Sequence, residues 1–343
     1  MSEENIVLIA STPLHLFDAI IIAQSFPQNR YHLLYIDQIS LEDVYFAALQ
    51  IWKNTPFIST HIVMTKKKSL LEKIQSKKTS IREILAFIDM IKPQRIIVGN
   101  DRKNETAAVI QKVKHTIAID YMDDGLHSYI IEQSHIFKYT FVDSCLKSIV
   151  YMHKIITPKI IGGSKYIENL YLYQPALRHV ALKDKPAYRL DTSYLHKPNI
   201  QEWISIVIQK LHIDLDQELS DISSILFLPH PKELSKEKLL LLQKKLLHKE
   251  HIAIKLHPRD NTSKIYFQSH RIIHQRLSAE IIFLSDHTIK IYGFSSTALL
   301  MAKWLHPTLS VSSLQFNTGK FTELEQLMQH NGIEVLSINT IEF

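Results

Sequence analysis

The sequence is poor in glycine and cysteine, and it has no long hydrophobic run. Only seven of its 343 residues are glycine, whereas roughly 7% is usual in globular proteins. The single cysteine, Cys145, cannot form an internal disulfide or build a cysteine-ligated metal site. No segment reaches the roughly 20 consecutive apolar residues of a membrane-spanning helix. A disulfide-linked scaffold is therefore excluded. The few glycines are expected where the backbone turns sharply or a ligand comes close.

The charge balance is moderately basic. Lys and Arg number 40 against 34 Asp and Glu, which gives a net charge of +6 and a pI of about 9.0. Such a balance favours anionic partners such as nucleotides, acidic sugars, phospholipid head groups or nucleic acid. Near the N-terminus, Glu3 and Glu4 precede the first apolar run, and Pro13 follows its end. We therefore expect no signal peptide and a cytoplasmic protein.

Short β-branched runs alternate with longer helical patterns along the chain. This alternation is typical of α/β proteins built on parallel sheets. We predict strands over residues 6–11, 32–37, 61–65, 95–100, 116–122, 224–228, 252–256, 288–292, 308–312 and 333–338. We predict helices over residues 14–25, 41–53, 69–91, 104–114, 235–249, 278–284, 296–305 and 320–329.

One stretch, residues 184–199, loses this periodicity and contains two prolines. We interpret it as a linker between two doubly wound, Rossmann-like domains. The predicted domains are residues 1–190 and 191–343, with a cleft between them.

In open parallel sheets, ligands bind beyond the carboxyl ends of the strands, so the residues that follow each strand are the candidate site residues. The strand over 116–122 is followed by Asp123, Asp124 and Gly125. A carboxylate at this edge can take a proton from an attacking hydroxyl. The alternative is an ordinary Asp-Gly turn whose carboxylates cap the next helix.

The strand over 252–256 is followed by His257 and Pro258. A histidine here can donate a hydrogen bond or a proton to a departing phosphate, with Lys255 or Arg259 adding positive charge. A His-Pro pair is also common without chemistry, as His306 and Pro307 illustrate between a predicted helix and a strand.

The strand over 288–292 ends before Gly293, and Ser295, Ser296 and Thr297 open an apolar helix. Free backbone N–H groups and hydroxyls at a helix N-terminus can bind a phosphate. The alternative is a simple Ser/Thr N-cap.

Taken together, these three segments resemble the D/E-D/E-G, HP and paired-serine motifs of bacterial sialyltransferases, in order and spacing. The similarity is closest to glycosyltransferase family 52, the lipooligosaccharide and capsule sialyltransferases. Residues 11–20 resemble the family's N-terminal strand-to-helix turn, and residues 277–283 resemble a short segment that carries a glutamate. The chain departs from the family at Pro229 and His230, where a glutamine-containing segment is usual.

The resemblance implies a GT-B fold and an inverting, metal-independent transfer of sialic acid from CMP-sialic acid, with no cofactor. Asp124 would be the base, with Asp123 the less favoured candidate, and His257 would stabilise or protonate the leaving CMP. Ser295 and Ser296 would bind the donor phosphate, and Glu280 would hold the ribose hydroxyls. The residues expected at the CMP site as a whole are Gly293, Ser295, Ser296, Thr297, Lys255, Pro258 and Glu280.

The sequence indicates the acceptor-binding residues less clearly than the donor-binding residues. Asn100 and Arg102 follow a strand of the first domain, and Thr12 lies in the N-terminal turn, so we interpret these three as acceptor-binding candidates. A polar loop with an N-cap for the next helix is the alternative. The expected acceptor is a glycan or glycolipid, and the resemblance adds a homodimer and a peripheral contact with the inner membrane.

Three other functions stay open at this point. A transferase of a related CMP-linked nonulosonic acid, or a polysialic acid polymerase, would share the same short motifs. A GT-B transferase with another donor is a second possibility. A non-catalytic α/β protein that binds nucleotides or nucleic acid is a third, favoured only by the basic pI. We expect no nucleic-acid partner, because arginine-rich stripes and recognisable nucleic-acid modules are missing from the sequence.

Overall fold

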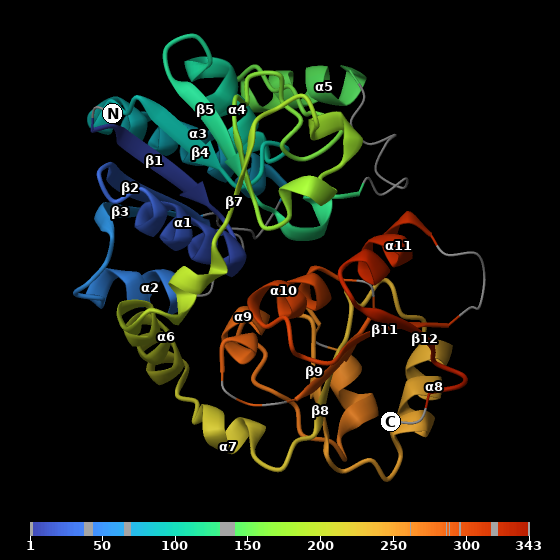
Figure 1. Ribbon diagram of the computed structural model, residues 1–343. Helices are drawn as coiled ribbons and strands as arrows, with labels where there is room; N and C mark the ends of the chain where they lie inside the picture. The colour runs from blue at the N-terminus through green and yellow to red at the C-terminus, as the bar shows by residue number, and fades with distance from the viewer. Residues whose placement is uncertain are drawn as a thin grey trace. The chain divides into compact units, whose positions relative to one another are not determined.

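The computed structural model describes residues 3–37, 44–64, 70–130, 141–260, 262–285, 287, 289–294, 296–316 and 322–341. The chain forms two compact units, Met1–Trp203 and Ile204–Phe343, and each is built on one parallel sheet (Figure 1). Within the described ranges, no helix is long and apolar enough to cross a membrane.

The first unit contains a seven-stranded sheet with the order β3-β2-β1-β4-β5-β6-β7. Its strands are β1 (Asn5–Ala10), β2 (Arg30–Asp37), β3 (Phe57–Met64), β4 (Arg95–Val98), β5 (Ala118–Met122), β6 (Leu170–Leu172) and β7 (Ala187–Arg189). Its helices are α1 (Pro13–Ser25), α2 (Val44–Ile51), α3 (Leu70–Ile91), α4 (Asn104–Val113) and α5 (Phe141–Tyr151), and α6 (Pro198–Leu211) begins in it. β1 is buried from Ile6 to Ala10, as expected for a central parallel strand covered on both faces.

The second unit contains a five-stranded parallel sheet with the order β12-β11-β10-β8-β9. Its strands are β8 (Ser224–Phe227), β9 (Ile252–Lys255), β10 (Lys290–Gly293), β11 (Val311–Gln315) and β12 (Glu334–Ser337). Its helices are α7 (Leu215–Leu219), α8 (Lys236–Leu246), α9 (Ala279–Phe283), α10 (Thr297–Leu305) and α11 (Glu323–His330). A core of buried Leu, Ile and Phe side chains lies between the sheet and α8.

The ten predicted strands all occur, with ends that differ by a few residues, and they confirm the two doubly wound sheets. The interpretation of residues 184–199 as a linker is wrong, because β7 lies inside this stretch and pairs with β6. The units divide after Trp203, within α6, rather than after residue 190. Trp203 is fully buried and its ring packs 5.1 Å from that of Phe17, so the chain up to this point belongs to the first core.

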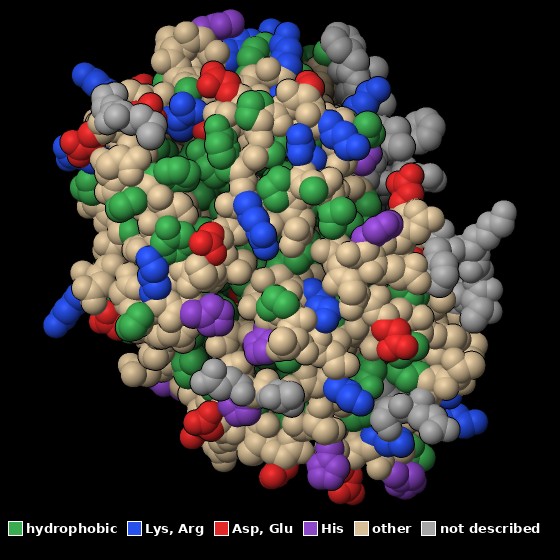
Figure 2. All heavy atoms as spheres, in the orientation of Figure 1, with side chains coloured by type: hydrophobic (Ala, Val, Ile, Leu, Met, Phe, Trp, Pro, Cys, Tyr) green, Lys and Arg blue, Asp and Glu red, His purple; other side chains and the backbone are tan. Residues whose placement is uncertain are grey.

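The charged side chains are mixed on the face shown in Figure 2. Lys and Arg side chains lie among Asp and Glu side chains on this face and do not form one continuous stripe.

Candidate active site

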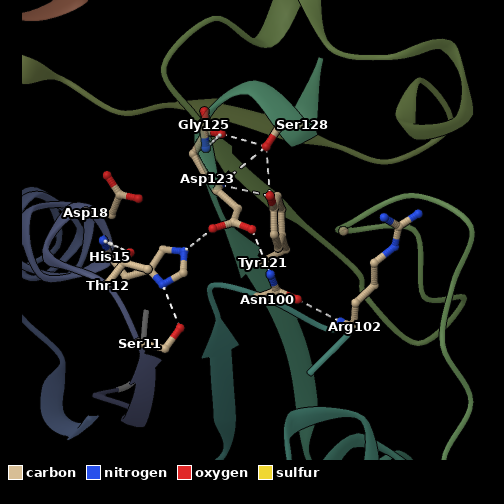
Figure 3. Close-up of polar contacts among 12 residues, drawn as sticks. Ser11, Thr12, His15, Asp18, Asn100, Arg102, Tyr121, Asp123, Gly125 and Ser128 are labelled. Carbon is tan, nitrogen blue, oxygen red and sulfur yellow. Dashed lines mark hydrogen bonds and ion pairs between the residues drawn. The ribbon is translucent and has the colours of Figure 1, made fainter. Parts of the chain in front are cut away.

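The order of the first sheet reverses between β1 and β4, and ligands bind parallel α/β sheets at such a switch point. Polar side chains follow the strands here. Ser11 and His15 come after β1, Asn100 comes after β4, and Asp124 comes after β5. Figure 3 shows Ser11 turned toward the His15 ring, and His15 and Asn100 turned toward a carboxylate of the segment that follows β5.

Asp124 is held by two side chains from the neighbouring segments. His15 Nε2 lies 2.9 Å from Oδ1, and Asn100 Nδ2 donates to Oδ2 at 2.7 Å. The other ring nitrogen of His15, Nδ1, lies 3.2 Å from the Ser11 hydroxyl oxygen. The contact between His15 Nε2 and Asp124 Oδ1 has the distance of an ion pair without the geometry of a hydrogen bond, and the Ser11 hydroxyl holds the other side of the ring. The chain Ser11–His15–Asp124 fixes the orientation of the carboxylate.

Gly99 makes room for this histidine. His15 is fully buried, and a Cβ built at Gly99 would lie 2.5 Å from its ring. Only glycine lets the backbone directly after β4 lie so close to the imidazole. One of the chain's few glycines is thus explained by the site.

Asp124 keeps an exposed part. Its side chain is 13% accessible, and its backbone N–H donates to the Tyr121 hydroxyl at 2.9 Å. A carboxylate that is fixed in this way and still reaches solvent can accept a proton from a bound hydroxyl.

Asp123 is a different kind of carboxylate. It is fully buried and accepts hydrogen bonds from Gly125 N–H, Ser128 Oγ, Tyr129 Oη and Tyr173 N–H at 3.0, 2.6, 2.5 and 3.1 Å. Burial raises its pKa to about 6, against these hydrogen bonds, which lower it. Asp123 therefore anchors the turn after β5 and the segment after β6, and its geometry gives a substrate no access.

The other acceptor-side candidates have structural contacts. Thr12 caps α1, because its hydroxyl accepts from His15 N–H at 3.3 Å and Pro13 occupies the first turn. Arg102 donates from Nε to the Pro158 carbonyl at 3.0 Å. Asn100, the third candidate, donates to Asp124.

The order of the second sheet reverses beside β8, with β9 on one side and β10 on the other. His257 follows β9, and its ring lies 5.0 Å from that of His230, which follows β8. The pKa of His257 is lowered to about 4, chiefly by burial and also by His230, Arg259 and Lys255, against the opposite effect of Asp260. His257 is therefore neutral near pH 7 and can act as a hydrogen-bond donor.

Lys255 and Glu280 are both buried in the second unit. Lys255 donates from Nζ to the Gln275 carbonyl at 2.9 Å, and burial lowers its pKa to about 8, although Glu280 acts in the opposite direction. Burial also raises the pKa of Glu280, against the attraction of Lys255. Two of the predicted CMP-site residues are thus buried and close enough for each to shift the pKa of the other.

α10 begins four residues after Gly293, the last residue of β10. A Cβ at Gly293 would lie 3.0 Å from Leu299 Cδ2, so the glycine lets the helix pack closely on its own strand. Ser296 is the N-cap residue, but its hydroxyl forms no capping hydrogen bond, and Thr297 is the first helical residue. Ser295 lies outside the described residues. Pro258 is exposed, directly after His257.

Sequence reasoning gave no role to Ser11, His15 or His230. His15 was detectable only as part of the strand-to-helix turn over residues 11–20, because its partner Asp124 lies far along the chain. His230 stood out only as a departure from the family pattern. In the parts of the chain that the structure covers, no group of three or more His, Cys, Asp or Glu residues is placed to hold a metal ion.

Comparison with known proteins gives a fold and no family. No family model and no curated protein sequence matches the chain. Solved structures do match, among them an α/β-galactoside α-2,3-sialyltransferase from Photobacterium phosphoreum, at 12% identity and a TM-score of 0.61, over 98% of this chain and 100% of that one. A UDP-GlcNAc 2-epimerase from Methanocaldococcus jannaschii matches at 13% identity and 0.55, over 97% and 89%. MnaA from S. aureus, solved with UDP, matches at 12% identity and 0.57, over 98% and 84%.

Two parallel Rossmann-like sheets together with these neighbours define a GT-B fold, the fold of glycosyltransferases and of UDP-GlcNAc epimerases. At such low identity the likeness extends to the fold alone.

Proposed function

We propose that the protein is an inverting, metal-independent glycosyltransferase. It moves sialic acid, or a related nonulosonic acid, from a CMP donor to a hydroxyl of a cell-surface glycan such as lipooligosaccharide or capsule. The observation that carries this proposal is the geometry of Asp124, a partly exposed carboxylate held by His15 and Asn100 at the switch point of the first sheet. The motif set of bacterial sialyltransferases and the GT-B fold support the choice of donor.

In this reaction the acceptor oxygen attacks the anomeric carbon of the donor while the bond to the CMP phosphate oxygen breaks. The acceptor proton passes to Asp124. The anomeric configuration inverts, because attack and departure take place on opposite faces. A bound acceptor hydroxyl needs a base within hydrogen-bond reach, which is the role that the exposed part of Asp124 suits.

The leaving CMP would be stabilised by His257. Its imidazole is neutral in the unliganded protein, since burial lowers its pKa to about 4. It would first donate a hydrogen bond to the phosphate. The negative charge of the phosphate then raises the pKa of His257, which prepares it to transfer a proton as the bond breaks.

The remaining donor contacts follow the motif. Ser296 suits the phosphate because its hydroxyl does not cap α10, so the N-terminal N–H groups of that helix lack this partner. Glu280 is assigned to the ribose. The other CMP-site residues are Ser295, Thr297, Gly293, Pro258 and Lys255. Asn100, Arg102 and Thr12 stay acceptor-side assignments, and a homodimer and a peripheral inner-membrane contact stay predictions.

A UDP-sugar donor is the second candidate, because structural neighbours of this fold were solved with UDP. A polysialic acid polymerase would use the same donor on a different acceptor. A nucleic-acid-binding role has less support, because such proteins present a basic patch or stripe. The face in Figure 2 instead shows basic side chains interspersed with acidic ones.

The test is nucleotide release in EDTA, with galactose-terminated acceptors. The donors are CMP-sialic acid, other CMP-nonulosonic acids and UDP-N-acetylglucosamine. Acceptor-stimulated CMP release that is lost in Asp124→Asn and kept in His306→Gln supports the proposal. Release of UDP alone would move the assignment to the second candidate, and release of neither nucleotide would contradict both.

A further inference from the structure

Two neighbouring strands of the second sheet end in the same four-residue pattern. β8 is followed by His230-Pro231-Lys232-Glu233, and β9 is followed by His257-Pro258-Arg259-Asp260. Each pattern reads histidine, proline, a basic residue and an acidic residue. Because β8 and β9 are adjacent and parallel, both segments lie at one edge of the sheet.

The two segments also fold in the same way. Glu233 N–H donates to the His230 carbonyl at 2.8 Å, and Asp260 N–H donates to the His257 carbonyl at 2.8 Å. Each histidine is therefore the first residue of a tight turn that its proline helps to fix.

Equivalent hydrogen bonds from the backbone hold the side chains of the two histidines. Lys232 N–H donates to Nδ1 of His230 at 3.2 Å, and Arg259 N–H donates to Nδ1 of His257 at 3.1 Å. A neutral imidazole that accepts at Nδ1 carries its proton on Nε2. Each ring thus presents an Nε2–H donor, and neither donor has a hydrogen-bond partner among the residues that the structure describes.

The two rings pack against each other in an edge contact, which places both imidazoles together at this edge of the sheet. Their centroids are 5.0 Å apart with an interplanar angle of 65°. Both rings are half-buried, whereas Lys232 and Arg259 are exposed. Asp260, an acid close to His257, already accepts hydrogen bonds from Thr262 and Ser263. Among the described residues, neither Lys232 nor Arg259 forms an ion pair within 4.0 Å, so both cations can contribute to binding an anion at this edge.

We propose that His230 and His257 form a paired-imidazole site that binds one anionic group, the phosphate of a nucleoside monophosphate. The identification of the ligand as a nucleotide rests on the proposed function. The pairing of the two histidines rests on the geometry of the two turns. His230 is then a second phosphate ligand, supplied by the segment in which the chain departs from its resembled family. Hydrogen bonds from both rings to an anion are charge-assisted and strong.

The first experiment uses inorganic phosphate as the probe and histidine NMR as the readout, on the full chain. Phosphate should raise the pKa of both imidazoles together, because each gains an anionic partner. His230→Gln should weaken phosphate binding by about tenfold or more, the loss expected for one hydrogen bond to a charged group.

His306→Gln is the matched control, because His306 also begins a tight His-Pro turn, with Leu309 N–H donating to its carbonyl at 3.0 Å. That turn precedes β11 and so lies at the opposite, amino edge of the sheet. The His306→Gln substitution should therefore leave phosphate binding unchanged. Unchanged phosphate binding in His230→Gln, or a pKa response of His257 alone, would overturn the pairing.

Further binding measurements distinguish the pairing of the two histidines from the proposed function. CMP should lose affinity in His230→Gln while cytidine, which lacks the phosphate, should not. If acetate competes as well as phosphate, the site prefers a carboxylate and the phosphate assignment is overturned. If phosphate binds both rings and CMP binds no more tightly than phosphate, the pairing stands and the CMP-dependent function fails.

Discussion

At the scale of single residues, the two adjacent carboxylates after β5 show how environment divides one motif into two roles. Asp123 is fully buried and accepts four hydrogen bonds, whereas Asp124 is partly exposed and is held by His15 and Asn100. The sequence could favour Asp124 only through its resemblance to a family. Burial and partners, which come from residues far along the chain, distinguish the two.

Asp123 should make stability depend on pH. Its pKa is raised from 3.8 to about 6 by burial, so the folded state binds a proton that the unfolded state releases between these values. Its stabilising contribution is present below about pH 4 and is lost as the pH rises through 6, at up to about 1.4 kcal/mol per pH unit. Asp123→Asn should remove this part of the pH dependence, measured by urea unfolding at pH 4, 5, 6 and 7. An unchanged slope would contradict the prediction, and Asp124→Asn is the control.

Gly99→Ala tests whether His15 positions the proposed base, Asp124. The new Cβ would lie 2.5 Å from the His15 ring, so the imidazole must move and release Asp124. We expect a loss of roughly 1–3 kcal/mol in stability, the usual cost of overpacking. Acceptor-dependent turnover should fall by about tenfold or more, while CMP affinity stays as in the wild type. Full turnover in this variant would show that the position of His15 does not matter.

At the scale of elements, the sequence predicts short, mostly apolar strands well. β1 and β9 are such strands, and the predicted ranges 6–11 and 252–256 agree with them within a residue. β6 and β7 were missed because each has three residues, too few to show alternation. α6 was missed because Pro198 was read as part of a linker, although a proline is well tolerated in the first turn of a helix.

The N-terminus of α10 offers a test at this scale. The Ser296 hydroxyl forms no capping bond, whereas Thr322 caps α11 in a full capping box with Glu325. Thr322→Ala should cost about 1 kcal/mol of stability, and Ser296→Ala should cost clearly less. CMP affinity should fall only in Ser296→Ala. Equal destabilisation of the two variants by urea unfolding would show that Ser296 acts as an ordinary cap.

At the scale of the whole molecule, the GT-B fold is the part of the sequence prediction that is confirmed most fully. Alternating strands and helices specify two parallel sheets, and their strand orders place polar strand ends at two switch points. The side-chain network at each switch point joins segments that no local pattern connects. Donor and acceptor identity depend on such networks, which is why they stay proposals.

Ligand binding should be visible in the stability of the full chain. A nucleotide that binds only the folded protein stabilises it by about 2.7 kcal/mol at a concentration of 100 times its Kd. CMP should therefore raise the thermal unfolding midpoint, whereas cytidine should raise it much less because it lacks the phosphate. A larger shift with UMP or UDP than with CMP would contradict the assigned donor.

The most direct test of the central claim is single-turnover transfer from CMP-sialic acid by Asp124→Asn, with CMP affinity measured in parallel. The account predicts a transfer rate lower by about 10²–10⁴-fold, the usual contribution of a general base, with unchanged CMP affinity and a folded protein. A transfer rate within a factor of two of the wild type would show that Asp124 is not the base and would contradict the account.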